Sequence, residues 1–136
     1  MVQDDTSTGV AAGHRHAAEH ATIERRHVDD HTRVSRAHVA AHEALCNRQC
    51  DEHARLADRH IAQHEKAAEA TSRQKAALST RHAAQHASME VRHATQLAWM
   101  AARHAGERFR IDGRHALELA AQERRHSRED RPSHQP

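Results

Sequence analysis

The 136-residue sequence has very few aromatic side chains: no tyrosine, one tryptophan (Trp99) and one phenylalanine (Phe109). Apolar residues make up 37% of the chain and many of them are alanine, so too little bulky side chain is present to fill a thick globular interior. Glycine occurs only four times, and the two prolines, Pro132 and Pro136, stand at the end. Because helix breakers are scarce and good helix formers dominate, the sequence predicts an all-α fold.

Several signatures of function are missing as well. No apolar run is long enough for a membrane span or a signal-peptide core, and the start, MVQDDTSTG, lacks the early arginine of a transit peptide. A glycine-rich phosphate loop, a nucleophile elbow and an HExxH motif are also absent. Acidic residues accompany the arginines, which argues against nucleic-acid binding. We therefore expect a cytoplasmic, non-enzymatic protein that binds neither nucleic acid nor membrane, with Cys46 and Cys50 reduced.

Histidine, by contrast, occurs 17 times and recurs with a period of eleven residues. Two columns at this spacing, one starting at His16 and the other at His20, hold 15 of the 17 histidines. Arginine precedes most histidines of the first column, as Arg15 does. Another column carries an acid or amide at nearly every step from Glu19 to Glu129. The periodicity indicates a long repetitive helix.

Eleven residues over three turns, about 3.67 per turn, favour a straight or slightly right-handed coiled coil. The two histidine columns and an apolar column share one face of such a helix and form its seam. We expect the acid/amide column to lie on a solvated flank, paired with arginines four residues earlier, as in Arg15–Glu19. The apolar seam positions are Ile23, Val34, Leu45, Leu56, Leu78, Met89, Met100 and Ile111.

The register weakens between residues 65 and 80, where Thr71 and Lys75 replace histidines, but no glycine or proline marks a turn there. We therefore predict one continuous helix with eleven-residue repeats over residues 12–128. A helical hairpin bent within 66–77 is the alternative.

Residues 1–11 and 129–136, outside this helix, are predicted to be disordered tails. A single helix with so polar a seam is not stable alone and needs a partner to cover its face. We therefore expect a parallel homo-oligomer in which aliphatic and histidine layers alternate along the seam.

Histidines four residues apart lie one above the other on a helix and are able to chelate zinc, nickel or copper. The eleven-residue period produces such pairs automatically, so a seam-filling role competes with metal binding. The five pairs are His16/His20, His27/His31, His38/His42, His60/His64 and His82/His86.

A second candidate metal site lies in the segment HEALCNRQCDEH, residues 42–53. Its four possible ligands, His42, Cys46, Cys50 and His53, share one helix face, and thiolate with imidazole suits zinc or Cu(I). The competing interpretation is structural, because alanine, serine or valine fills many of the other positions of both cysteine columns.

The order Leu/Ile, Ala, His and His at offsets 0, 1, 4 and 8 resembles the repeats of late-embryogenesis-abundant-type desiccation proteins. Those repeats carry apolar residues and lysines where this chain has histidine and arginine. The resemblance implies a stress protein that is disordered until bound or crowded.

The repeat pattern itself favours another function, a coiled-coil scaffold or stalk that acts by self-association within a larger assembly. Its histidine layers would be pH-sensitive: the assembly should loosen between about pH 6.5 and 5, because histidines buried in the neutral form must take up protons. A histidine-rich protein that binds or buffers zinc, nickel or copper is the alternative.

Overall fold

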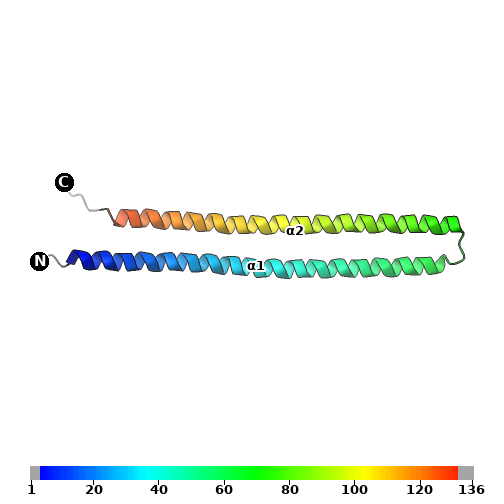
Figure 1. The fold of residues 1–136 in the computed structure, drawn as a ribbon, viewed down its shortest axis with the longest axis horizontal. Coiled ribbons are helices and arrows are strands. Elements are labelled where there is room, and N and C mark those ends of the chain that lie inside the picture. The colour runs from blue at the N-terminus through cyan, green and yellow to red at the C-terminus, as the bar shows by residue number, and fades with distance from the viewer. Residues whose placement is uncertain (1–3, 132–136) are drawn as a thin grey trace. The chain divides into compact units, whose positions relative to one another are not determined.

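Two long helices form the protein in this computed structural model, which describes residues 4–131 (Figure 1). Helix α1 spans Asp4–Lys66 and helix α2 spans Ser72–Glu129. No strand occurs within residues 4–131, so the prediction of an all-α fold is confirmed. Neither described helix has a stretch with the length and apolar character of a membrane span.

The chain turns between α1 and α2, at residues 67–71. The prediction of one continuous helix over residues 12–128 is therefore wrong, and the bend lies within the alternative range, 66–77. The last turn of α1 tightens as it ends, because the Ala68 N–H donates to the Glu65 carbonyl three residues back (3.3 Å).

A capping box at Thr71 starts the second helix. The Thr71 backbone N–H donates to Gln74 Oε1 (3.0 Å), and the Gln74 backbone N–H donates to Thr71 Oγ1 (3.2 Å). This reciprocal pair satisfies N–H groups that a helix start otherwise leaves without partners. The sequence TSRQ at 71–74 carries the signal, and a search for glycine or proline alone does not find it.

Both predicted tails overlap the helices at their inner ends. Helix α1 begins at Asp4, inside the segment 1–11, and α2 ends at Glu129, the first residue of the segment 129–136. Residues 1–3 and 132–136, the outer parts of the two predicted tails, lie outside the described residues.

The chain divides into two compact units, each of which pairs a segment of α1 with a segment of α2. The turn unit is Ala37–His104, and the end unit combines the residues up to Arg36 with those from Ala105 onward. The paired segments are antiparallel, because later residues of α1 meet earlier residues of α2. Contacts that define this direction are Glu19–His126 and Glu24–His115 in the end unit, and Glu52–His93 and Gln63–His82 in the turn unit.

The apolar column forms a thin core in each unit. Ile23 and Ile111 are buried in the end unit, and Leu45, Leu56 and Met89 are buried in the turn unit. The remaining seam positions, Val34, Leu78 and Met100, are half-buried. These side chains were predicted to meet equivalent positions of other copies. In the structure, the other helix of the same chain covers them.

Candidate functional site

Histidines of the first column meet across each helix pair and stack ring on ring. Their planes lie within 9° of parallel. Each eleven-residue step forward along α1 corresponds to an eleven-residue step back along α2. The two histidines of every pair therefore belong to the same column and lie equally far from Thr71 in the sequence. The stacked layers are His16/His126 (centroids 3.4 Å apart) in the end unit, and His38/His104 (3.3 Å) and His60/His82 (3.6 Å) in the turn unit.

The acid/amide column of one helix accepts hydrogen bonds from layer histidines of the other. It was expected on a solvated flank, paired with arginines of its own helix. In place of the expected pair Arg15–Glu19, Arg15 lies 3.7 Å from Glu129 across the interface. The histidine Nε2 distances to these acceptors are His16–Glu129 (2.8 Å), His126–Glu19 (3.0 Å), His93–Glu52 (3.1 Å), His60–Gln85 (3.0 Å) and His82–Gln63 (2.6 Å).

An adjacent arginine and histidine can reach the same carboxylate of the opposite helix. Arg92 and His93 both bond to Glu52 Oε2. The hydrogen bond from His93, followed by that from Arg92, lowers the pKa of Glu52 below its ordinary value of 4.5. The recurrent Arg-His dipeptide therefore supplies two donors to one acid across the helix pair.

The end-unit layer His16/His126 has a carboxylate at each ring. The hydrogen bond from His126 lowers the pKa of Glu19 below 4.5. The hydrogen bond from His16 does the same for the pKa of Glu129, with Arg15 as a further positive neighbour. Both acids therefore stay ionised at pH values where unpaired carboxyl groups begin to take up protons.

The turn-unit layer His60/His82 has neutral amides in the equivalent places, Gln85 and Gln63. His82 is buried, and burial lowers its pKa below the ordinary value of 6.5, with His60, His64 and Arg81 as further positive neighbours in that order. The surroundings of this layer favour an uncharged His82 ring.

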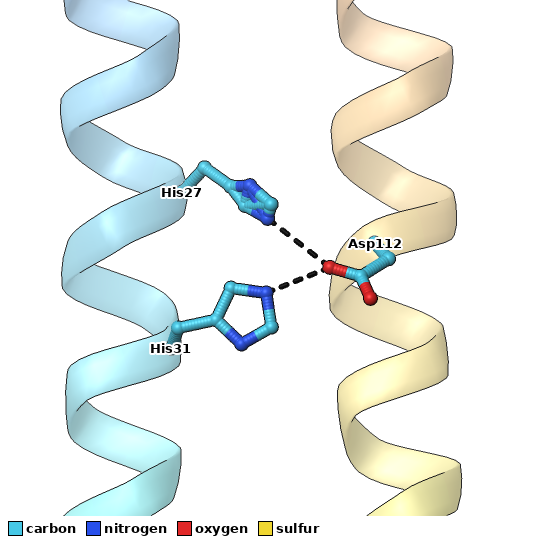
Figure 2. Close-up of side chains that lie close together, drawn as sticks. All are labelled: His27, His31 and Asp112. Carbon is cyan, nitrogen blue, oxygen red and sulfur yellow. Dashed lines mark hydrogen bonds and ion pairs between the residues drawn. The ribbon is translucent and has the colours of Figure 1, made fainter.

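The layer at His27 and His115 is built differently from the stacked layers. Its rings are 3.7 Å apart but tilted by 44°. His27 Nε2 lies 3.2 Å from Asp112 Oδ1, and His31 Nε2, one turn further along α1, lies 2.7 Å from the same oxygen. Figure 2 shows both imidazoles pointing from α1 toward this carboxylate on α2. Within residues 7–131, this is the one group of three metal-ligating side chains whose ligand atoms all lie within 4.8 Å of one another.

The other predicted metal ligands are arranged differently. Cys46 Sγ lies 3.7 Å from His42 Nδ1, but Cys50 is exposed and does not join them in a three-ligand group. His53 packs edge-on against the rings of His86 and His93. Of the five predicted histidine pairs, only His27/His31 belongs to a three-ligand group among the described residues.

Asp112 is the candidate ligand that the sequence interpretation missed. It stands in the column beside the seam that holds the small residues Ala57, Ser79 and Ala101. Glutamates also occur in this column, at 24, 90 and 123, so a carboxylate there did not single out Asp112. The contacts of Asp112 with His27 and His31 arise because the two helices run antiparallel. The prediction of parallel contacts between copies did not consider that pairing.

Comparison with known proteins gives no match: no family model, curated protein or solved structure matches this chain. Its function has to be inferred from its own residues.

Proposed function

We propose that the chain is a non-enzymatic structural protein, a scaffold or spacer of a larger assembly, whose helix pairing responds to pH through its histidine layers. The observation that supports this most directly is the different chemistry of two otherwise similar layers. His16/His126 is bonded to two carboxylates, whereas His60/His82 is bonded to two amides.

The carboxylate-bonded layer should tolerate mild acid. As the pH falls below about 6.5, imidazoles begin to take up protons. Glu19 and Glu129 are still ionised there because their pKa values are lowered below 4.5. Each protonated ring of His16 or His126 then faces an anion in a charge-assisted hydrogen bond. This layer weakens only when its carboxylates themselves are protonated, at a pH below 4.5.

The amide-bonded layer should respond in the opposite way. Protonation of His60 and His82 would stack two cations 3.6 Å apart beside His64 and Arg81, without a facing carboxylate among the bonds of the layer. Because the pKa of His82 is lowered in the folded state, its contribution to stability is complete above pH 6.5 and is lost as the pH falls below that value.

Exchanging the acceptors tests the proposal. In the double variant Gln63→Glu/Gln85→Glu, the turn-unit layer gains the carboxylates of the end-unit layer. We expect its free energy of unfolding to fall less between pH 7.5 and pH 5.5 than that of the wild type. The matched control, Glu19→Gln/Glu129→Gln, makes the reverse exchange and should become more sensitive to acid. Urea unfolding followed by circular dichroism measures all three proteins at both pH values.

Identical pH dependence in the three proteins would refute a response set by the histidine layers. The same spectra test the desiccation-protein interpretation. We expect the wild type at pH 7.5 to be helical without a partner or a crowding agent, and a disordered spectrum would contradict both the paired helices and the proposed function.

Self-association remains part of the proposal, but it needs a surface other than the seam, because the seam is covered within the chain. Large apolar side chains on the outer faces provide that surface. Trp99 in the turn unit is 74% exposed and Phe109 in the end unit is 78% exposed. Aromatic side chains are enriched among the residues that dominate protein–protein binding energy.

A further inference from the structure

We propose that His27, His31 and Asp112 bind one zinc ion, which links α1 to α2 in the end unit. The site is distinct from the pH-responsive layers and does not depend on them. Two imidazole nitrogens and one carboxylate oxygen are a common zinc donor set, and water or another small ligand fills the fourth tetrahedral position when three protein groups bind.

The distances between the ligand atoms fit this assignment. Bonds of about 2.0–2.1 Å in a tetrahedron place ligand atoms roughly 3.4 Å apart. His27 Nε2 is 3.2 Å and His31 Nε2 is 2.7 Å from Asp112 Oδ1. The bound ion requires a small opening of the His31 contact, and the third separation, between the two Nε2 atoms, is within 4.8 Å. It takes the place of the two Nε2 protons, which move to Nδ1 in the other neutral tautomer.

The packing around His27 differs from that of the stacked layers, and the difference brings metal-ligating side chains together. In the stacked layers the rings lie parallel, but the His27 ring is tilted by 44° from that of His115. By the register of those layers, His27 would bond to Glu118, which instead lies 3.7 Å from Arg26. His27 bonds to Asp112, where it converges with His31.

The side chains of the site are open to solvent. The Asp112 side chain is 61% exposed and that of His31 is 33% exposed, so an ion enters from solvent and a water molecule has room to complete its coordination.

The opposite half of the same layer lacks one ligand. His115 Nε2 lies 3.1 Å from Glu24 Oε1. This contact is equivalent to that between His27 and Asp112, because Glu24 and Asp112 belong to the same column of the repeat. The position that mirrors His31 is Leu119. His20 Nε2 also lies 3.8 Å from Glu24 Oε1, but His20, Glu24 and His115 do not form a group whose ligand atoms all lie within 4.8 Å of one another. The helix pair therefore has one converging three-ligand half, and zinc is proposed only there.

Zinc titration of the full-length chain at pH 7.5, followed by isothermal calorimetry, tests the site. The variants are His31→Gln and Asp112→Asn. The control is His20→Gln, which removes the histidine of the same column one repeat earlier. We expect one tight zinc ion per wild-type chain and wild-type affinity in the control. In each site variant we expect an affinity weaker by at least the roughly 10- to 100-fold that loss of an outer-shell partner costs. Circular dichroism checks that each variant remains helical.

A second readout does not depend on the calorimetric fit. Zinc should raise the melting temperature of the wild type and of His20→Gln, because binding to the folded state alone stabilises it. It should raise that of His31→Gln and Asp112→Asn much less. Equal zinc affinity in all four proteins, or several equivalent ions per chain, would overturn the proposal, since zinc would then be bound by histidine pairs in general.

Discussion

At the scale of single residues, histidines in equivalent places of the repeat differ because their partners differ. His93 shares Glu52 with Arg92, whereas His82 is bonded to Gln63. The repeat fixes where a histidine lies, and the other helix supplies the acceptor to which it bonds. In place of the uniform acid response of buried neutral histidines that the sequence suggested, we therefore expect individual layers to respond differently.

The carboxyl group of Glu52 provides a direct check of these contacts. We predict that its pKa, measured by carbon-detected NMR titration, lies below 4.5, because hydrogen bonds from His93 and Arg92 favour the ionised form. His93→Gln should move the pKa back toward 4.5 by more than Arg92→Gln does, since the bond from His93 is the larger cause. The reverse order of the two variants would show that the arginine dominates this cluster.

A second prediction at this scale concerns the thin apolar core. Leu56 is buried in the turn unit, and Leu56→Ala should lower the free energy of unfolding by about 2–5 kcal/mol, because it removes buried methyl groups and leaves a cavity. Ile61→Ala is the matched control on the same helix, since Ile61 is exposed, and should change the free energy by less than about 0.5 kcal/mol. Urea unfolding at pH 7.5 distinguishes them, and similar losses would contradict the assigned burial.

At the scale of the helices, the eleven-residue period predicted the face but not the partner. Ile23, Leu45 and Leu56 belong to the column that it selects, and all three are buried. A period describes one helix, and the same stripe is covered equally well by a parallel copy or by an antiparallel segment of the same chain. The break between the two helices has a local signal, the capping box at Thr71 and Gln74, in which threonine replaces a histidine of the repeat.

The capping box is testable by itself. Thr71→Ala should lower the free energy of unfolding by about 1 kcal/mol, because the Gln74 N–H loses its side-chain acceptor at the start of α2. The control is Thr80→Ala. Thr80 lies inside α2 and bonds to the Ala76 carbonyl (3.1 Å), and its replacement should be neutral or slightly stabilising because alanine is the better helix former. Equal losses in the two variants would rule out a capping role.

The two halves of the His27/His115 layer lead to a prediction at the same scale. If three converging ligands make a zinc site, Leu119→His should complete the two-ligand half formed by His115 and Glu24. We expect the number of tight zinc ions per chain to rise from one to two in calorimetric titration. Leu117→His serves as control, because Leu117 is 71% exposed on an outer face and should leave the number at one.

The candidate site could be predicted only in part from the sequence. The spacing of four residues identified His27/His31 as a possible chelating pair, but it identified four other histidine pairs equally well. Asp112 distinguishes this pair, and its distance from His27 in the sequence becomes a contact only through the antiparallel register. The cluster His42, Cys46, Cys50 and His53 was proposed from one helix face alone, and the described side chains do not converge there.

At the scale of the whole molecule, the covered seam changes what association between copies requires. Trp99→Gln should reduce the mass of the protein in solution, measured by light scattering across a concentration series, because it removes a large exposed apolar side chain. Its free energy of unfolding should stay within about 0.5 kcal/mol of the wild type. A wild type that has the mass of one chain at every concentration would refute self-association.

The symmetry of the first histidine column about Thr71 has a consequence for how such a chain can change length. Removing eleven residues from α1 and the mirror-image eleven from α2 leaves each remaining layer with its former partner. Removing eleven residues from one helix alone moves the centre of symmetry away from Thr71. Histidines that pair across the helices are then no longer equally far from the turn. The paired helices are thus expected to tolerate insertions and deletions in balanced pairs, one in each helix at equal distances from the capping box.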